Sequence, residues 1–387
     1  MIRRLGQRAG SRLLTSDTLR RLTHSCHALP RRVMQRERVV EYFHELDDPY
    51  SMLAAQSLAP LVARHRIDLR MHAVPPPSQS ALPQRAAWRV WAERDVDRLA
   101  RHWGIDPRRL ANPTSLDTSS SALEASESRR RRLGHYQGAM FYFEGEWYWG
   151  LDRLHYLERR LGSAVPLFPV PALRFEPPLS DPAPTIDFYC SLRSPYTYLA
   201  IAQLRQLAGH YGARVRLRPL LPMVKRGVPL SRAKRLYIVR DAKREATRLG
   251  LRFGDIVDPL GIAVERGLAI LNQAITRDRA SLTPGLDFLE SFLQGVFADG
   301  VDAAEPRSLV HLMSRSGFDS SELEASRIGA VLADASWQEE LEANRKDLVA
   351  RGLWGVPSFQ VNDRPALWGQ DRLWMLEEDL MRVGDRT

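Results

Sequence analysis

Residues 186–200, with the sequence IDFYCSLRSPYTYLA, decide the fold of this chain. The stretch begins with an apolar segment typical of a strand, continues through a short polar turn, and then places Pro195 at the start of a helix-like segment. Proline is accepted in the first turn of a helix because its missing N–H would have no partner there in any case. The stretch therefore predicts a strand that leads through a tight turn straight into a helix.

The same pattern occurs 146 residues earlier, without a gap, in residues 40–54, VEYFHELDDPYSMLA. A second pair of matching segments lies further along: residues 149–154 are WGLDRL and residues 368–373 are WGQDRL. In both copies, leucines continue at helical spacing after this motif. Their separation of 219 residues is far longer than the roughly 20–50 residues of solenoid repeats. The sequence therefore predicts a duplicated domain.

The two copies define a predicted domain organisation. We expect a basic N-terminal arm at 1–35, a first domain at 36–162, a proline-rich linker at 163–184 and a second domain at 185–387. Seven prolines lie between Gly162 and Thr185, which favours an extended, semi-rigid linker. The second domain carries a large, mostly helical insertion at about 222–352, and the first carries a much shorter one at about 83–133.

Hydrophobic periodicity predicts the elements of the second copy. After the opening strand we expect helices at 196–208, 232–249, 264–277, 284–298 and 337–350, strands at 214–220, 358–361 and 365–368, and a last helix from 370 onward. The order is strand–helix–strand, a helical insertion, and then strand–strand–helix.

The net charge of +10 does not by itself indicate a nucleic-acid partner. Only four of the 56 basic residues are lysines, and the run from Arg129 to Arg132 is short. Nucleic-acid-binding domains gather their basic residues on one surface or in a recognisable motif, and neither a zinc finger nor a compact basic helix is present. We therefore expect no nucleic-acid partner, and assign the charge the milder role of attracting small anionic substrates.

Other composition signals concern membranes and redox state. No run approaches 18 apolar residues, so no membrane partner is expected. The segment from Met1 to Arg32 is rich in arginine and lacks the apolar core of a secretory signal; it suits a disordered or loosely helical arm, with a transit peptide as the alternative. Cys26 and Cys190 form neither a disulfide framework nor a metal-binding motif, which favours a reducing compartment and a cytoplasmic location.

The motifs of the second copy occur in a thioredoxin-like order. The second copy resembles the DsbA-like branch that contains 2-hydroxychromene-2-carboxylate isomerase and kappa-class glutathione transferases. The resemblance rests on the opening strand and helix, the segment Gly355-Val356-Pro357 and the motif at 368–373. The resemblance covers nearly all of the second copy. It implies an α/β fold with two tandem thioredoxin-like (DsbA-like) domains, each with a helical insertion.

The resemblance also implies a catalytic role for Ser194. Thiol–disulfide members of the family begin this helix with Cys-x-x-Cys, whereas this chain has Ser194 and Thr197, so a dithiol cycle is not possible. A serine hydroxyl at a helix N-terminus can donate a hydrogen bond to a bound thiolate, and the helix dipole favours the same charge. The resemblance implies that Ser194 activates the sulfur of glutathione. The alternative is that Ser194 only caps the helix, a position that serine favours.

The same resemblance implies a glutathione pocket. Pro357 corresponds to the family's cis-proline, which would leave the backbone of Val356 free to pair with glutathione as an added strand. Asp371 would take the γ-glutamyl ammonium and Gln370 its carboxylate, although an acid at this position also complements the helix dipole, as Asp152 does in the first copy. Lys234 would hold the glycyl end or a substrate acid, with Arg235 as the alternative.

Three substitutions set this chain apart from the family pattern. Asp48 stands where Ser194 stands in the second copy, and its charge would repel a thiolate. We place Met140 at the position of Pro357, so the first copy is expected to be catalytically silent. The isomerases carry Gly-Asn before the Lys234 segment, but here Gly227 is followed by valine, a departure that bears on the substrate more than on glutathione.

These observations predict a glutathione-dependent isomerase or transferase acting on a small molecule, for which an aromatic-derived acid is the candidate. A non-catalytic binding or scaffold protein is the alternative, and the missing Cys-x-x-Cys argues against a thiol–disulfide oxidoreductase. Because related enzymes are often homodimers, the resemblance further implies that the first copy acts as a built-in partner for the second, in an intramolecular pseudo-dimer. Another thiol in place of glutathione stays open at this point.

Overall fold

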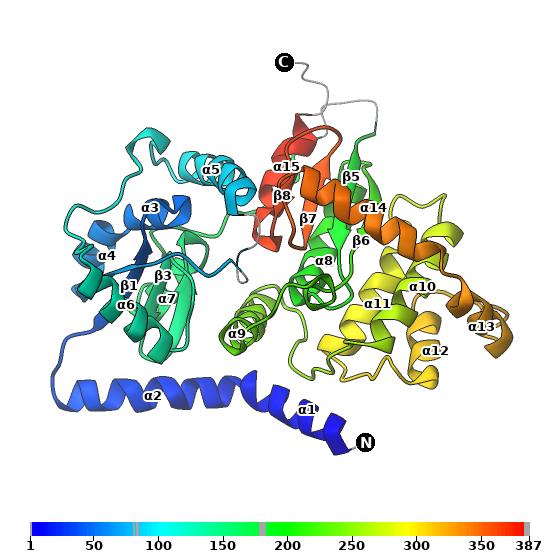
Figure 1. Ribbon diagram of the computed structural model, residues 1–387, viewed down its shortest axis with the longest axis horizontal. Helices are drawn as coiled ribbons and strands as arrows, with labels where there is room; N and C mark the ends of the chain where they lie inside the picture. The colour runs from blue at the N-terminus through cyan, green and yellow to red at the C-terminus, as the bar shows by residue number, and fades with distance from the viewer. Residues whose placement is uncertain (1, 80–81, 83–84, 178–182, 383–387) are drawn as a thin grey trace. The chain divides into compact units, whose positions relative to one another are not determined.

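The computed structural model describes residues 2–79, 82, 85–177 and 183–382. The chain divides into two compact units (Figure 1). We call Met1–Ser16, Ala172–Gly227 and Ile238–Thr387 the C-terminal unit, and Asp17–Pro171 with Val228–Tyr237 the N-terminal unit. Within the linker proposed at 163–184, residues 178–182 lie outside the described part of the chain, as do the last five residues of the second domain. The domain boundaries stay predictions.

The C-terminal unit is built on one four-stranded sheet in the order β6-β5-β7-β8. The strands are β5 (Thr185–Cys190), β6 (Arg214–Pro219), β7 (Ser358–Val361) and β8 (Leu367–Trp368). The β5–β6 pair is parallel, and β7 is antiparallel to both β5 and β8. Helix α8 (Pro195–His210) connects β5 to β6, and η4 (Gln370–Arg372) with α15 (Leu373–Met381) follows β8. The predicted strand–helix–strand and strand–strand–helix segments are confirmed.

The insertion between β6 and β7 is helical, as predicted. Its helices are η3 (Met223–Arg226), α9 (Arg232–Arg248), α10 (Ile262–Arg277), α11 (Leu286–Phe297), α12 (Pro306–Arg315), α13 (Ala325–Ala333) and α14 (Ser336–Ala350). Figure 1 shows α10 to α13 gathered together, with α14 running back toward the sheet. At Gly267 in α10, a Cβ would lie 2.6 Å from the Phe292 ring and 2.7 Å from Leu192, so a larger residue would separate these elements. Helices α12 and α13 lie within the region predicted to be mostly helical, although the prediction did not name them individually.

The N-terminal unit has its own four-stranded sheet, in the order β2-β1-β3-β4. Its elements are α2 (Asp17–Val33), β1 (Val39–Glu45), α3 (Pro49–Ala55), α4 (Leu58–His65), β2 (Asp68–Val74), α5 (Arg85–His102), η1 (Pro107–Arg109), α6 (Ser120–Arg132), β3 (Met140–Phe143), β4 (Glu146–Trp149), η2 (Leu151–Arg153) and α7 (Leu154–Arg160). Pro60 explains the break between α3 and α4, because it has no N–H to bond to the carbonyl four residues earlier.

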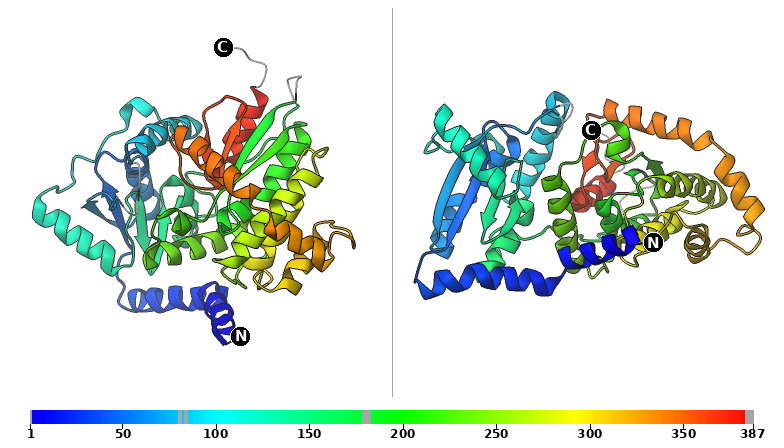
Figure 2. Two further views of the ribbon diagram at one scale, coloured as in Figure 1. Left: turned by 45° about the vertical axis from the view of Figure 1, so that its right-hand side comes forward. Right: turned by 60° about the horizontal axis from the view of Figure 1, so that its bottom comes forward.

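The expected N-terminal arm forms two regular helices, in agreement with the helical alternative of the prediction and not with the disordered one. Helix α1 (Ile2–Leu14) groups with the C-terminal unit, and α2 groups with the N-terminal unit. Both views of Figure 2 show α2 as one long helix that precedes the turn into β1. Among the described residues, no helix is long and apolar enough to cross a membrane, and no cluster of His, Cys, Asp and Glu side chains could hold a metal ion.

Strand register relates the two sheets residue by residue. Val39 pairs with Asp68 in the first sheet, and the residues 146 positions later, Thr185 and Arg214, pair in the second. On the other side of the central strand, Phe43 pairs with Met140, and Tyr189 pairs with Ser358. Met140 therefore corresponds to Ser358.

The residue at the Pro357 position is thus Ala139, and the assignment of Met140 was wrong by one residue. A matching backbone hydrogen bond supports this register: the Gly150 N–H donates to the Ala139 carbonyl at 2.7 Å, and the Gly369 N–H donates to the Pro357 carbonyl at 2.9 Å. Ala139 has a φ of 53°, which is unusual for a residue with a side chain. The expected loss of the proline in the first copy holds with the corrected residue.

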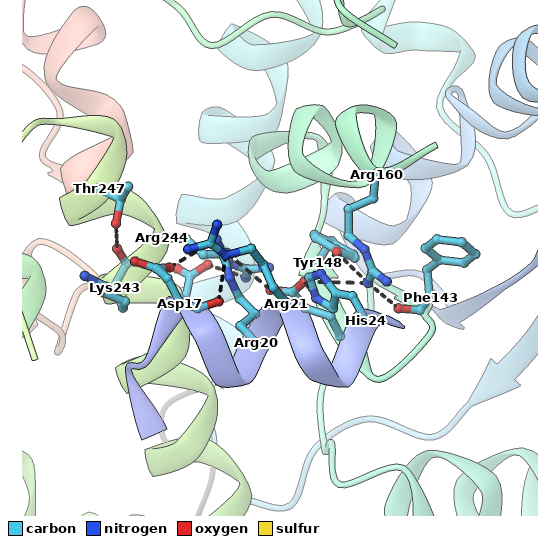
Figure 3. Close-up of polar contacts among 12 residues, drawn as sticks. Asp17, Arg20, Arg21, His24, Phe143, Tyr148, Arg160, Lys243, Arg244 and Thr247 are labelled. Carbon is cyan, nitrogen blue, oxygen red and sulfur yellow. Dashed lines mark hydrogen bonds and ion pairs between the residues drawn. The ribbon is translucent and has the colours of Figure 1, made fainter. Parts of the chain in front are cut away.

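Ionic contacts inside the N-terminal unit hold the strands to neighbouring elements. Burial raises the pKa of Glu41 in β1, but hydrogen bonds from His72 and Arg129 outweigh that effect and lower it to about 2. Arg160 of α7 reaches the Phe143 carbonyl at 2.8 Å and the Tyr148 hydroxyl at 3.2 Å (Figure 3). These contacts tie α6 to β1, 88 residues earlier in the sequence, and α7 to the neighbouring strands β3 and β4.

Candidate active site at the start of helix α8

Ser194 occupies the N-cap position of α8. Its side-chain oxygen accepts a hydrogen bond from the Thr197 N–H at 3.1 Å, which satisfies one of the free donors in the first turn. Its hydroxyl proton is directed to the carbonyl oxygen of Val356 at 3.4 Å. This distance lies beyond the usual range for O–H···O bonds. Ser194 is therefore held in place by one good hydrogen bond and keeps a proton that is only weakly engaged.

The segment opposite Ser194 contains a cis peptide bond between Val356 and Pro357, as the resemblance implied. Val356 is half-buried, and its N–H has no hydrogen-bond partner among the described residues. Ser358, the residue after Pro357, begins β7 and pairs with Trp368. The backbone of Val356 thus lies at the end of a strand with a donor available, beside the N-terminus of α8.

Two of the family-like motifs contact each other directly. A Cβ at Gly355 would collide with the indole of Trp368, so this position accepts only glycine without rearrangement. Trp354 packs against the same indole edge-on, with ring centroids 5.0 Å apart. Gly369, with a φ of 110°, lets the chain turn after β8 while its N–H binds the Pro357 carbonyl. The tryptophan–glycine motif therefore holds the proline segment in position.

Gln370 and Asp371 follow this turn, but their side chains interact with each other. The buried Gln370 donates to a carboxylate oxygen of Asp371 and, at 3.1 Å, to Glu245. Its own side-chain oxygen has no partner within the described part of the chain. The amide donors that we expected to bind a ligand carboxylate are thus used within the protein, where they orient Asp371.

A buried polar network that the sequence analysis missed lies beside this turn. The Tyr196 hydroxyl donates to Asp241 at 2.9 Å, and Arg244 donates to the same carboxylate at 2.7 Å. The N-terminal unit has the same contact 146 residues earlier, where the Tyr50 hydroxyl donates to Asp95 at 2.7 Å. The signal was present in the sequence, because residues 94–98 and 240–244 share the pattern Arg-Asp-x-x-Arg at the same offset.

Arg226 is a second residue that the sequence analysis did not identify. Its guanidinium donates to the backbone carbonyls of Leu221 and Trp354, both at 2.9 Å, and its buried Nη2 has no partner among the described residues. Burial lowers its pKa to about 10, and the nearby Arg345 acts in the same direction. A buried guanidinium without a carboxylate partner is unusual. Trp354, whose carbonyl Arg226 binds, lies two residues before Val356.

Lys234 is the one predicted site residue outside the C-terminal unit. It belongs to the segment Val228–Tyr237, which groups with the N-terminal unit. Its ammonium lies 6.0 Å from the centre of the Tyr136 ring, and burial lowers its pKa to about 8. The other predicted residues, Ser194, Val356, Pro357, Gln370 and Asp371, all belong to the C-terminal unit.

The corresponding helix start in the N-terminal unit carries carboxyl groups. Asp48 caps α3 by accepting a hydrogen bond from the Ser51 N–H at 2.8 Å. Burial raises the pKa of Asp48. Burial also raises the pKa of Glu45 to about 7, with a further contribution from the charge of Asp48, although Arg85 lies 2.6 Å away and opposes the shift. This site is suited to holding a proton, and it offers a thiolate no hydroxyl donor at the cap.

The cysteines take no part in these sites. Cys190 ends β5 and is fully buried, and burial raises its pKa well above the usual range. Cys26 is exposed on α2. A buried thiol of this kind behaves as a small hydrophobic residue.

Comparison with known proteins identifies the family. The model of the DSBA-like thioredoxin domain matches residues 185–381. A 2-hydroxychromene-2-carboxylate isomerase of Pseudomonas putida is 27% identical over 207 residues, which cover 51% of this chain and 95% of that protein. The isomerase of the same name from Pseudomonas sp. (strain C18) is 29% identical over 201 residues, covering 50% of this chain and 88% of that protein.

Solved structures also align over about half of this chain. A selenomethionine 2-hydroxychromene-2-carboxylate isomerase aligns at 23% identity and a TM-score of 0.42, over 52% of this chain and 96% of that one. The cytosolic disulfide reductase DsbM from Pseudomonas aeruginosa with GSH aligns at 17% identity and a TM-score of 0.37, over 52% and 97%. The family match covers the sheet of the C-terminal unit, α8 and the helical insertion. This chain therefore belongs to the DSBA-like thioredoxin domain family.

Proposed function

We propose that this protein is a glutathione-dependent isomerase or transferase whose active site lies at the start of α8. The observation that carries the proposal is the position of Ser194, which caps α8 and directs a weakly engaged hydroxyl proton toward Val356. Curated relatives named as isomerases, which align over half of this chain, support the reaction class.

The hydrogen bonds of Ser194 explain how it would activate a thiol. Its bond from the Thr197 N–H fixes the oxygen, while the 3.4 Å contact with the Val356 carbonyl is weak enough to be exchanged. A hydrogen bond to a charged acceptor is roughly twice as strong as one between neutral groups. Exchange of the carbonyl for a thiolate is therefore favourable, and the free N–H groups of the first turn stabilise the same charge.

The neighbouring groups suit the rest of glutathione. The free N–H of Val356 would pair with the peptide backbone of glutathione as an added strand, and Asp371, oriented by Gln370, would bind the γ-glutamyl ammonium. Arg226 would take a carboxylate, either the glycyl end or that of a substrate acid, because its buried charge has no carboxylate partner among the described residues. We keep Lys234 as a proposed contact with the same carboxylates, on the sequence resemblance alone.

The proposed substrate is a small, conjugated, aromatic-derived acid. In the isomerase case the thiolate adds to a carbon of the conjugated double bond, the resulting single bond rotates, and the thiolate leaves, so that no atom is gained or lost. In the transferase case the carbanion formed by addition takes up a proton and the thioether is the product. A reducing, cytoplasmic location is proposed with either reaction, because glutathione keeps thiols reduced there.

We further propose that the N-terminal unit is a duplicated, degenerate DsbA-like domain. The same strand order, the same register offset of 146 residues and the repeated Tyr–Asp contact support a common origin. Asp48 in place of Ser194 and Ala139 in place of Pro357 support the loss of its catalytic function. Its proposed role is structural, as an internal partner in the manner of a homodimer.

Isothermal titration of glutathione into the full chain tests the pocket. We expect saturable binding that Asp371→Ala and Arg226→Met weaken, and that Asp152→Ala leaves unchanged, because Asp152 is the matched position in the N-terminal unit. Lys234→Met in the same series tests the resemblance-based contact. If millimolar glutathione does not bind to the wild type, the glutathione proposal fails, and a scaffold role or a different thiol replaces it.

Turnover of chromene-type acids and of electrophiles separates the two reactions. We expect Ser194→Ala to bind glutathione but to lose turnover, because the thiol keeps its ordinary pKa of about 8.5 without help. Consumption of glutathione in proportion to product indicates a transferase, and product formation without consumption indicates an isomerase. Full activity in Ser194→Ala would refute the assigned role of the serine.

A further inference from the structure

Helix α2 uses polar residues to contact its own unit. His24 lies 2.8 Å from Glu146, and Arg31 lies 2.6 Å from Glu144. Between these two acids, Gly145 passes so close to the helix that a Cβ there would lie 2.8 Å from the ring of His27. The three helix residues are spaced by three and four positions, so they share one face. That face binds the turn between β3 and β4.

The opposite face of α2 is apolar and exposed. It carries residues spaced alternately by three and four positions: Leu19, Leu22, Cys26, Leu29 and Val33. Their exposed fractions are 41% for Leu19, 55% for Leu22, 64% for Leu29 and 74% for Val33, and Cys26 is also exposed. We call these five residues the α2 stripe.

The orientation of α2 is the reverse of what a surface helix normally adopts. Amphipathic helices of globular proteins turn the apolar face toward the core and the polar face toward water. No residue of α2 is buried, so the α2 stripe gains nothing from the fold of its own unit. Contiguous exposed apolar surface of this kind marks an interaction site.

The charge around the α2 stripe argues against a second copy as its occupant. Residues 17–36 contain five arginines and one acid, Asp17. Two copies would therefore bring like charges together. The positions that flank the stripe, namely Thr23, Ser25, Pro30 and Arg32, also lack the paired acids and bases by which coiled-coil helices select each other.

The same features suit an anionic lipid surface. Helices that lie in the membrane interface combine an apolar stripe with an arginine-rich polar face, and their affinity rises with buried apolar area and with the charge of the lipid. Arg21 and Arg32 of α2 lie beside the α2 stripe, and Arg36 follows the end of the helix. All three are exposed and form no ion pair among the described residues. We propose that α2 is a docking surface for an anionic lipid bilayer, with the α2 stripe in the apolar layer and these arginines at the headgroups.

The proposal revises the expectation that the protein has no membrane partner. That expectation rested on the lack of a segment long enough to span a bilayer, and a helix that lies in the interface needs no such segment. The docking proposal is independent of the glutathione site, because the contacts of α2 that support this proposal all lie within the N-terminal unit.

The positions of the two cysteines allow a direct test in the full chain. Cys26 lies in the middle of the α2 stripe and is exposed, whereas Cys190 is fully buried, so an environment-sensitive thiol fluorophore labels Cys26 selectively. The labelled protein is mixed with vesicles of phosphatidylcholine alone or of phosphatidylcholine and phosphatidylglycerol in equal parts. Sedimentation of the unlabelled protein with the same vesicles controls for the fluorophore.

We expect a blue shift and cosedimentation with the anionic vesicles, and much less of both with phosphatidylcholine alone or at high salt. Leu22→Ser combined with Leu29→Ser should weaken binding by about 100-fold, roughly tenfold for each leucine no longer buried. Val90→Ser is the matched control, because Val90 is 53% exposed on α5 of the same unit but lies outside the α2 stripe. It should bind as the wild type does.

Three results would overturn the proposal. The first is a wild type that stays in the supernatant with anionic vesicles. The second is a double leucine variant, shown by circular dichroism to be folded, that binds as tightly as the wild type. The third is a wild type that does not bind vesicles but self-associates, with the self-association lost in the double variant. That result would identify a second copy as the occupant of the α2 stripe.

Discussion

Replacing Gly355 by alanine tests how the two signature motifs support the candidate site. A Cβ at this position would lie 2.5 Å from Nε1 of Trp368 and closer still to two carbons of the same ring. Carbon atoms pack at about 3.5–4.0 Å, so the indole would have to move by about 1 Å or more. Trp354 and the pairing of Trp368 with Ser358 both oppose this movement.

The expected cost of Gly355→Ala follows from this geometry. Forcing an extra methyl into a packed contact costs about 1–3 kcal/mol. For a domain of this size, each kilocalorie lowers the melting temperature by about 2–4 °C. We therefore expect a decrease of about 4–8 °C for a cost near 2 kcal/mol, measured by thermal denaturation of the full chain. Glutathione binding should weaken as well, because Val356 and Pro357 follow directly.

The matched control for this substitution is Gly209→Ala. Gly209 lies in α8, and a Cβ there would meet nothing within 4 Å. Alanine is favoured over glycine in a helix by about 1 kcal/mol, so this variant should be as stable as the wild type or more stable. If Gly355→Ala melts at the wild-type temperature, the contact between the two motifs is not as close as the structure shows, and the argument for mutual support fails.

Three further predictions concern the caps, the pH dependence and the repeated contact. Ser194→Asp should keep the helix cap, as Asp48 does in the N-terminal unit, but abolish turnover. The new carboxylate would repel the bound thiolate, because two like charges about 4 Å apart at an effective dielectric of about 20 repel by about 4 kcal/mol. Turnover near the wild-type rate would contradict the thiolate model. The pKa of Glu41 lies at about 2, below its ordinary 4.5, so the stability it contributes is present above about pH 4.5 and is lost as the pH falls through 2. Urea unfolding of Glu41→Gln should therefore show lower stability near neutrality and a smaller loss on acidification; an unchanged acid dependence would exclude this role. Tyr50→Phe and Tyr196→Phe should each cost about 1.5–3 kcal/mol, since each removes a hydrogen bond to a buried carboxylate, and markedly unequal losses in denaturant unfolding would argue against equivalent contacts.

The sequence predicted the elements of the C-terminal unit well because their signals are local. Helix α8 begins where Pro195 and a capping serine predict its start, and the strands β5 and β7 coincide with apolar segments next to recognisable turns. Helices α12 and α13 were not named individually, because they are short and lie in a long helical region where periodicity alone does not separate one helix from the next.

The error at Met140 shows where the comparison of two copies reaches its limit. The offset of 146 residues holds from β1 onward, and the motif at 149–154 requires an offset of 219. Between these segments the two copies share no residue pattern, so the sequence does not show where the offset changes. Strand pairing resolves it, because Phe43 and Tyr189 are equivalent residues, and their antiparallel partners are Met140 and Ser358.

The sequence by itself determined the family, the strand–helix start of each copy and the serine at the cap, because each depends on residues close together in the chain. Only the tertiary structure revealed that Arg226 has a buried donor with no partner in the described part of the chain. It alone also revealed that the Gln370 amide donates to Asp371 and Glu245, and that α2 turns its apolar face to water. These features depend on contacts between segments far apart in sequence. Such contacts are decided by packing and strand register, and a local pattern of residues does not encode them.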